Sequence, residues 1–181
     1  MSEAGGTGVD RLRYTRVAIA LHWTIAALVI VNLLLGLLHE DFERPVRASM
    51  MFFHKSIGMT VLGLTIVRLL WRLGHRPPPM DPAIKRWEKA LAHIVHFTFY
   101  LLLIGIPMTG WLLSSTGGRD ISFFGVVDIP PLPVRGEDAH DIFEERHELL
   151  ATIMIGLILL HIAGALKHQL QGHRVIGRMA P

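Results

Sequence analysis

Cysteine is absent from this chain of 181 residues. Its absence excludes disulfide bonds, thiolate-bound zinc, iron–sulfur clusters and the C-x-x-C-H motif that attaches haem covalently. No internal repeat is found, and the length is enough for one domain. Hydrophobic residues, by contrast, make up 51% of the chain, and the mean hydropathy of +0.42 is too high for an ordinary soluble domain of this size. Histidine is also abundant, with eleven residues.

Four apolar segments account for the high hydropathy. Each can cross a hydrocarbon layer of about 30 Å, which takes about twenty helical residues. In lipid the backbone must satisfy its own hydrogen bonds, so these segments should be helices. We therefore predict an all-α, integral-membrane four-helix bundle. Its helices should span about residues 16–39, 47–73, 87–113 and 140–170, within a single transmembrane domain over residues 15–181 that follows a disordered cytoplasmic tail over residues 1–14.

The distribution of Lys and Arg predicts the orientation of the bundle. The N-terminal tail, the second connection and the C-terminal tail, with the helix ends beside them, hold twelve Lys and Arg and four Asp and Glu. The opposite side holds six Lys and Arg and eleven Asp and Glu. The net charges of +8 and −5 add to the formal +3 of the chain. Because basic residues concentrate on the cytoplasmic side, both termini should be cytoplasmic.

Four histidines then pair by depth. The stretch HELLATIMIGLILLH places His147 near the outer surface and His161 near the inner surface, about 21 Å apart along one helix and on one face. The first predicted helix enters the membrane from the inner side, so His22 near its start should lie at the level of His161. The second enters from the outer side, so His54 should lie at the level of His147.

Two histidines at one depth on facing helices can bind both axial positions of a haem. Ionisable groups at membrane depth are costly and usually functional, so two such pairs favour a two-haem path across the membrane. Other histidines leave alternatives open, because His93 and His96 at the inner end of the third helix could replace His22 or His161. We expect small residues to let the macrocycles approach the backbone, namely Gly58, Gly63 and Gly156. We expect the remaining loop histidines to be solvated, namely His39, His75, His140 and His173.

Other classes of site fit the chain less well. A metal transporter would need carboxylates beside its imidazoles, and the central parts of the apolar segments contain none. A catalytic triad is unsupported as well, since Ser114 and Ser115 lie at a predicted helix end without a buried acid nearby.

Several stretches together resemble the bacterial cytochrome b561 family in its four-helix, di-haem form. They are IALHW, HKSIGMTVLGLTIVRLLWRL, HIVHFTFYLLLIGIPMTGWL, HELLATIMIGLILLHIAGALKH and RMAP, and they cover most of the chain from Arg16 to Pro181. The resemblance implies two non-covalent b haems, bound by His22 and His161 at the inner level and by His54 and His147 at the outer level. It also implies a location in the bacterial inner membrane and a quinone as electron partner, and some members of the family oxidise superoxide at the outer face and reduce ubiquinone.

Two further residues become candidates in that context. Lys55 adjoins His54 and lies near Arg44 and Arg47, so this basic cluster could steer an anion such as superoxide, or its side chains could simply extend to the lipid interface. His168, two turns beyond His161, could hydrogen-bond a quinone or anchor the helix in the interface.

Two rival functions remain open. The first is a cytochrome b subunit that relays electrons between quinone and a partner dehydrogenase, for which the acidic outer run around Glu137–Glu145 offers a docking surface. The second is a non-redox haem-binding sensor or scaffold, which the lack of a soluble signalling domain disfavours. Expected partners are thus membrane lipid, quinone, superoxide and, in the first rival, a dehydrogenase; no nucleic acid is expected.

Overall fold

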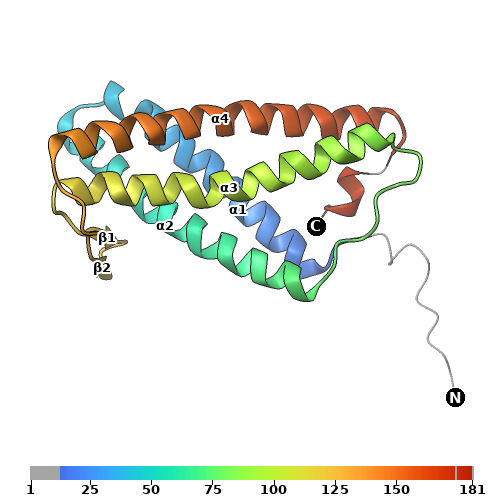
Figure 1. Ribbon diagram of the computed structural model, residues 1–181, viewed down its shortest axis with the longest axis horizontal. Helices are drawn as coiled ribbons and strands as arrows, with labels where there is room; N and C mark the ends of the chain where they lie inside the picture. The colour runs from blue at the N-terminus through green and yellow to red at the C-terminus, as the bar shows by residue number, and fades with distance from the viewer. Residues whose placement is uncertain (1–12, 174, 181) are drawn as a thin grey trace, which may run out of the picture.

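The computed structural model describes residues 13–173 and 175–180 and consists mainly of four long helices (Figure 1). All four helices are long and apolar enough to cross a membrane. Each boundary lies within three residues of the position predicted from the sequence. The helices are α1 (Arg16–Leu38), α2 (Arg44–Gly74), α3 (Arg86–Thr116) and α4 (Glu137–Leu170).

Local signals define where the helices begin. The Thr15 hydroxyl accepts a hydrogen bond from the N–H of Ala18 at 3.2 Å and caps α1. A proline occupies the first turn of α2, where its missing N–H has no cost. At the start of α3, the Glu88 carboxylate accepts a hydrogen bond from the N–H of Lys85 at 3.2 Å. Two short 3-10 helices complete the helical structure, η2 (His39–Asp41) after α1 and η3 (Ile176–Arg178) near the C-terminus.

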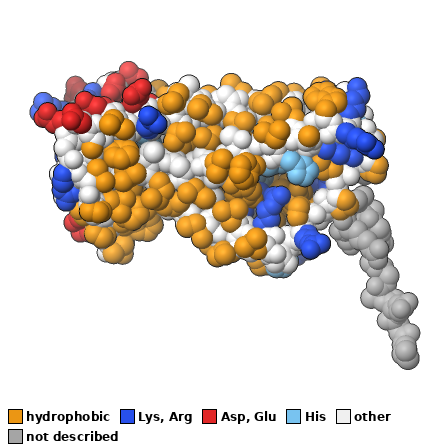
Figure 2. All heavy atoms as spheres, viewed as in Figure 1, with side chains coloured by type: hydrophobic (Ala, Val, Ile, Leu, Met, Phe, Trp, Pro, Cys, Tyr) orange, Lys and Arg blue, Asp and Glu red, His pale blue; other side chains and the backbone are white. Residues whose placement is uncertain are grey.

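The helices pack as two pairs. α1 lies along α2, α3 lies along α4, and α2 contacts α3, whereas α1 and α4 make little direct contact (Figure 1). Large apolar side chains cover the outside, as Figure 2 shows, and many are largely exposed, for example Leu159 at 64% and Leu70 at 63%. Such a surface is unfavourable in water and suits contact with lipid.

A small antiparallel hairpin folds against one end of the bundle. It pairs β1 (Ile121–Phe123) with β2 (Val127–Ile129). Ser56 of α2, which is fully buried, anchors it: the Ser56 hydroxyl donates to the carbonyl of Ser122 and accepts from the N–H of Phe124. The predicted helices over residues 87–113 and 140–170 leave a long loop from about Ser114 to Ala139, with no strand predicted in it. That interpretation was incomplete, because α3 continues to Thr116, α4 already begins at Glu137, and strands form between them.

The described parts of both termini meet at the opposite end of the bundle. The N–H of Tyr14 donates to the carbonyl of Arg178, and the Trp23 indole donates to the carbonyl of Met179 at 2.7 Å. Residues 1–12 of the predicted tail lie outside the described residues. We call the end that holds the termini the inner end and the end with the hairpin the outer end. Figure 2 shows Asp and Glu gathered at the outer end, in keeping with the charge asymmetry of the sequence.

Candidate functional site

At the outer end, His54 of α2 faces His147 of α4. Their ring centroids are 6.0 Å apart and the ring planes are inclined by 77°. The Nδ1 of His54 lies 3.0 Å from the carbonyl oxygen of Asn32, and the Nδ1 of His147 lies 3.0 Å from that of Ile106. A carbonyl can only accept, so each Nδ1 carries the proton and each Nε2 keeps its lone pair. Metal-binding imidazoles show the same pattern, in which a second hydrogen bond fixes the tautomer and the ring orientation.

Each outer histidine also packs against a glycine of the neighbouring helix. A Cβ atom at Gly36 of α1 would lie 2.9 Å from Cε1 of His54, and a Cβ at Gly110 of α3 would lie 3.0 Å from Cε1 of His147. In both cases the carbonyl that accepts the Nδ1 proton belongs to the residue four positions before the glycine. The two helix pairs therefore hold their outer histidines in the same way, by a glycine surface and a backbone acceptor.

At the inner end, three histidines surround one space. His161 of α4 has its ring centroid 6.4 Å from that of His22 on α1 and 5.5 Å from that of His96 on α3. Phe99 lies edge-on to His161 at 5.3 Å. His93 is not part of this group, since it is exposed and its Nδ1 donates to the carbonyl of Lys89 in its own helix.

The spacing of the pairs fits an iron atom between the rings. An iron bound by two imidazoles lies about 2 Å from each ligating nitrogen and each ring centre about 1.1 Å further back, so the centroids should be about 6.3 Å apart. The distances for His54 with His147, 6.0 Å, and for His22 with His161, 6.4 Å, match this value. The 5.5 Å between His96 and His161 is short for an intervening iron. Since α1 and α4 barely touch, the helix packing also leaves room between His22 and His161.

Lys55 points between helices beneath the outer hairpin. Its ammonium group donates to the Ser114 hydroxyl at 3.0 Å, and the side chain is half-buried. Arg119 is close enough to interact with it electrostatically. Of the basic cluster suggested by the sequence, Arg47 instead donates to the backbone carbonyl of Glu40 at 2.7 Å. The cation that joins Lys55 is therefore Arg119, which follows α3 in the chain.

His168 lies in a polar cluster at the inner end. Its Nδ1 is buried and has no hydrogen-bond partner within the described residues. Its ring centroid is 5.8 Å from that of His173, whose Nδ1 lies 3.3 Å from a carboxylate oxygen of Asp81. The N–H of Ala83 and, to a smaller extent, His173 hold the pKa of the Asp81 carboxyl below its usual value, so it is ionised at neutral pH. Nearby, Lys167 and Glu88 form an ion pair.

Sequence reasoning missed several of these residues. It did not name Gly36 and Gly110, which contact the outer histidines. The glycines that it did name, Gly58, Gly63 and Gly156, stay a prediction; a Cβ at Gly63 or Gly156 would meet no atom within 4 Å, which leaves space beside the backbone there. It also expected His173 to be solvated, whereas this side chain is 20% exposed and paired with Asp81. The sequence does contain a glycine in the helix that precedes each outer histidine. Which glycine contacts which ring becomes apparent only from the packing of α1 on α2 and of α3 on α4.

Four membrane-spanning helices with facing histidines, and no cysteine in the chain, define a class: membrane cytochromes that hold b-type haem within a helix bundle. The comparisons with known proteins agree. Residues 13–181 match the family described as prokaryotic cytochrome b561, and the chain belongs to that family. It is therefore an electron-transfer protein that binds haem b and crosses the bacterial inner membrane several times.

Individual relatives are similar over most of their length. The chain is 31% identical to cytochrome b561 homolog 2 of Escherichia coli strain K12 over 158 residues, which are 86% of this chain and 84% of the relative. It is 30% identical to the protein named "Probable superoxide oxidase CybB" of Yersinia pestis over 156 residues, 86% of this chain and 88% of the relative. Cytochrome b562 of Cereibacter sphaeroides is 29% identical over 164 residues, 86% of this chain and 87% of the relative.

The glycine contacts give a first prediction. In Gly36→Ala and Gly110→Ala the new methyl group must displace the ring of His54 or His147 and lengthen its hydrogen bond to the backbone carbonyl. Disturbing such a second hydrogen bond typically costs 10–100-fold in metal affinity. We expect each variant to lose about half of its haem during purification, measured as haem per protein after extraction.

Gly74→Ala is the matched control, because a Cβ there would meet no atom within 4 Å and Gly74 lies at the inner end of α2. Its haem content should equal that of the wild type. Full haem retention in both Gly36→Ala and Gly110→Ala would show that the glycine surfaces do not position the histidines.

Proposed function

We propose that this protein binds two b haems in series and carries electrons across the membrane from superoxide, oxidised at the outer face, to ubiquinone, reduced at the inner face. The observation that carries the proposal is the presence of two facing histidine pairs, His54 with His147 and His22 with His161, at opposite ends of one bundle with iron-compatible spacing. The excess of Lys and Arg at the inner end supports a cytoplasmic location for both termini.

His54 with His147 and His22 with His161 would hold the two haems in this proposal. When bound, haem b supplies a one-electron store at each of the two levels. The Nδ1 atoms of His54 and His147 donate to the carbonyls of Asn32 and Ile106, so each Nε2 keeps its lone pair for an iron atom without a change of tautomer. His161 serves the inner level, and its continuous helix α4 fixes the distance between the two levels.

At the outer end, Lys55 and Arg119 attract the anionic substrate. Lys55 follows His54 in α2, and Arg119 is close enough to Lys55 to interact with it electrostatically. The outer end is acidic overall, but a local cationic site can guide a small anion against an unfavourable net charge. The name of the Yersinia pestis relative supports superoxide as the donor.

At the inner end, His168 binds a quinone carbonyl oxygen and delivers a proton to it. Its buried Nδ1 has no partner among the described residues, so a ligand carbonyl would satisfy it. His173 and the ionised Asp81 connect this ring to the aqueous side and can hold a proton there. Reduction of one quinone to quinol takes two electrons, hence two superoxide ions, and two protons from the cytoplasmic side.

The test is to add superoxide to the purified, oxidised protein and follow the spectrum of the reduced b haem, with and without a soluble ubiquinone analogue. We expect rapid haem reduction without quinone, and quinol formation at half the rate of superoxide loss when quinone is present. His168→Ala should slow quinol formation and leave haem reduction unchanged. A protein that quinol reduces but superoxide does not would instead be a relay to a partner dehydrogenase.

The charge of Lys55 gives a second prediction. Attraction between an anion and this ammonium group acts over about a Debye length, about 8 Å at physiological ionic strength. Lys55→Gln should slow haem reduction by superoxide about threefold and flatten its salt dependence, because it removes an attraction of about 0.7 kcal/mol. Lys55→Glu should slow the reaction about tenfold, because it also adds a repulsion of similar size. Stopped-flow rates at several ionic strengths measure both effects.

Arg47→Glu is the control for Lys55. It makes the same charge change as Lys55→Glu at the outer end, but the Arg47 guanidinium lies against the backbone of Glu40. Its rate should stay near the wild-type value, and reduction by quinol at the inner end should be unaffected in every variant. Equal rates and equal salt slopes in Lys55→Glu and the wild type would remove Lys55 from the proposal.

A further inference from the structure

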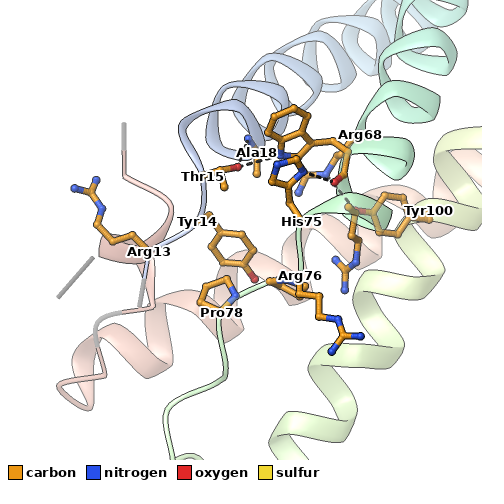
Figure 3. Close-up of a pocket in the computed structure, with 12 residues that line it drawn as sticks. Arg13, Tyr14, Thr15, Ala18, Arg68, His75, Arg76, Pro78 and Tyr100 are labelled. Atoms are coloured by element: carbon orange, nitrogen blue, oxygen red, sulfur yellow. Dashed lines mark hydrogen bonds between the residues drawn. The ribbon is translucent and has the colours of Figure 1, made fainter. Parts of the chain in front are cut away.

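A basic cavity opens at the inner end of the bundle, on the side of His22, and its lining residue Arg68 is close enough to that histidine to interact with it electrostatically. It encloses about 130 Å³ between the start of α1, the end of α2 and the middle of α3 (Figure 3). A water molecule occupies about 30 Å³ in the liquid, so the space suits a group of four or five heavy atoms, such as a phosphate. Four arginines line it, Arg13, Arg68, Arg72 and Arg76.

The cavity has positive charge and no counter-charge. None of its lining residues is Asp or Glu, and none of the four arginines pairs with a carboxylate within residues 13–173 and 175–180. Arg68, which is half-buried, donates to the Tyr100 hydroxyl and to the carbonyl of Ala18, both at 3.3 Å. Arg72 lies over the Tyr100 ring at 5.8 Å. These contacts orient the cations without neutralising them, so an anion would offset their mutual repulsion.

Fixed contacts hold the walls of the cavity in place. Arg13 donates to the carbonyl of Ala180 at 2.9 Å, and the Trp71 indole donates to the Thr15 hydroxyl at 3.0 Å. His75 stacks on the Trp71 ring with the centroids 3.9 Å apart. The cavity is therefore formed before any ligand arrives, which lowers the entropic cost of binding.

The position of the cavity favours a lipid over other sources of an anion. Arg13 precedes α1 and Arg76 follows α2, and the stretch from Arg16 to His22 alone spans about 9 Å of helix axis. The exposed arginines thus lie at the headgroup level, beyond the inner histidines. Beside them on α2, Leu70 is 63% and Leu73 is 82% exposed, which offers acyl chains an apolar surface. Aromatic side chains such as Trp71 also suit the interface between lipid and water.

We propose that this cavity binds the phosphate of an anionic phospholipid such as phosphatidylglycerol, with Arg13 and Arg76 at its entrance and Arg68 at its base. Basic pockets between membrane helices on the cytoplasmic side are suited to such headgroups. The site ties the start of α1 to the end of α2 through the lipid. It does not depend on the electron donor or on the quinone.

The test compares two double variants with equal loss of charge. Arg13→Gln/Arg76→Gln removes the entrance of the cavity, and Lys85→Gln/Arg86→Gln removes two cations that do not line it. Delipidated, haem-loaded protein is titrated with phosphatidylglycerol or phosphatidylcholine, and the bound lipids are counted by native mass spectrometry. We expect one tightly bound phosphatidylglycerol in the wild type and the control. Binding should weaken about thirtyfold in the cavity variant, since each cation near the surface contributes roughly fivefold.

Two further measurements distinguish a lipid phosphate from a free anion and from a haem carboxylate. Millimolar inorganic phosphate should compete only weakly, because it lacks the acyl chains. If phosphate alone binds as tightly as phosphatidylglycerol, the site is for a free anion and the proposal is wrong. If the cavity variant keeps its lipid but loses haem or shifts the haem midpoint potential, the arginines bind a carboxylate of the inner haem instead. Equal lipid binding in the two double variants would also overturn the proposal.

Discussion

Replacing one histidine of either pair should remove one of two haems and leave the other. His54→Ala is expected to lower the haem content from about two to about one per chain, because His147 alone cannot hold both axial positions. His161→Ala should give the same stoichiometry with loss of the inner haem. The pairs lie at opposite ends of α4, so neither change reaches the other pair. Haem extracted into acidified solvent, quantified against protein, measures the effect.

Spectroscopy and activity distinguish the two variants. The remaining haem should be low-spin in both, and superoxide should still reduce it in His161→Ala but not in His54→Ala. Quinol formation driven by superoxide should be lost in both, since the two levels act in series. His140→Ala is the control, because His140 is exposed and pairs only with neighbouring carboxylates of α4 among the described residues. Loss of all haem from a folded His54→Ala protein would mean that the ligands are paired differently.

The second prediction concerns which histidine binds the inner haem iron together with His161. We expect His22→Ala to lose the inner haem completely and His96→Ala to keep it. The reason is spacing: 6.4 Å between the centroids of His22 and His161 admits an iron, whereas 5.5 Å between His96 and His161 is too short. Haem content and the low-spin spectrum of the purified variants measure the outcome.

His96→Ala still has a smaller effect in this scheme. It removes a ring next to His161, so a modest shift of the inner midpoint potential is expected without loss of haem. His93→Ala, which alters an exposed histidine one turn earlier in α3, is the matched control and should change neither quantity. Haem loss in His96→Ala together with retention in His22→Ala would make His96 the ligand.

The fold was largely predictable, because lipid leaves the backbone few choices. A segment that must satisfy its own hydrogen bonds becomes a helix, so apolar length alone located α1 to α4 within three residues at each end. The hairpin of β1 and β2 was not predictable in this way. It depends on the buried Ser56 hydroxyl, which contacts the backbone of Ser122 and Phe124 far along the chain, and local patterns carry no information about such contacts.

For the candidate site, the sequence alone predicted which histidines lie at the same level of the bundle. Helical rise fixed the levels of His22, His54, His147 and His161, because 1.5 Å per residue along a spanning helix leaves little freedom. The residues around each ring could be found only from the packing of the helices. Packing of α1 on α2 and of α3 on α4 set Gly36 and Gly110 against the outer histidines, and folding of the outer connection brought Arg119 to Lys55. These contacts join residues on different helices, whose rotation and approach depend on side-chain packing across the whole bundle and not on the spacing within any one segment.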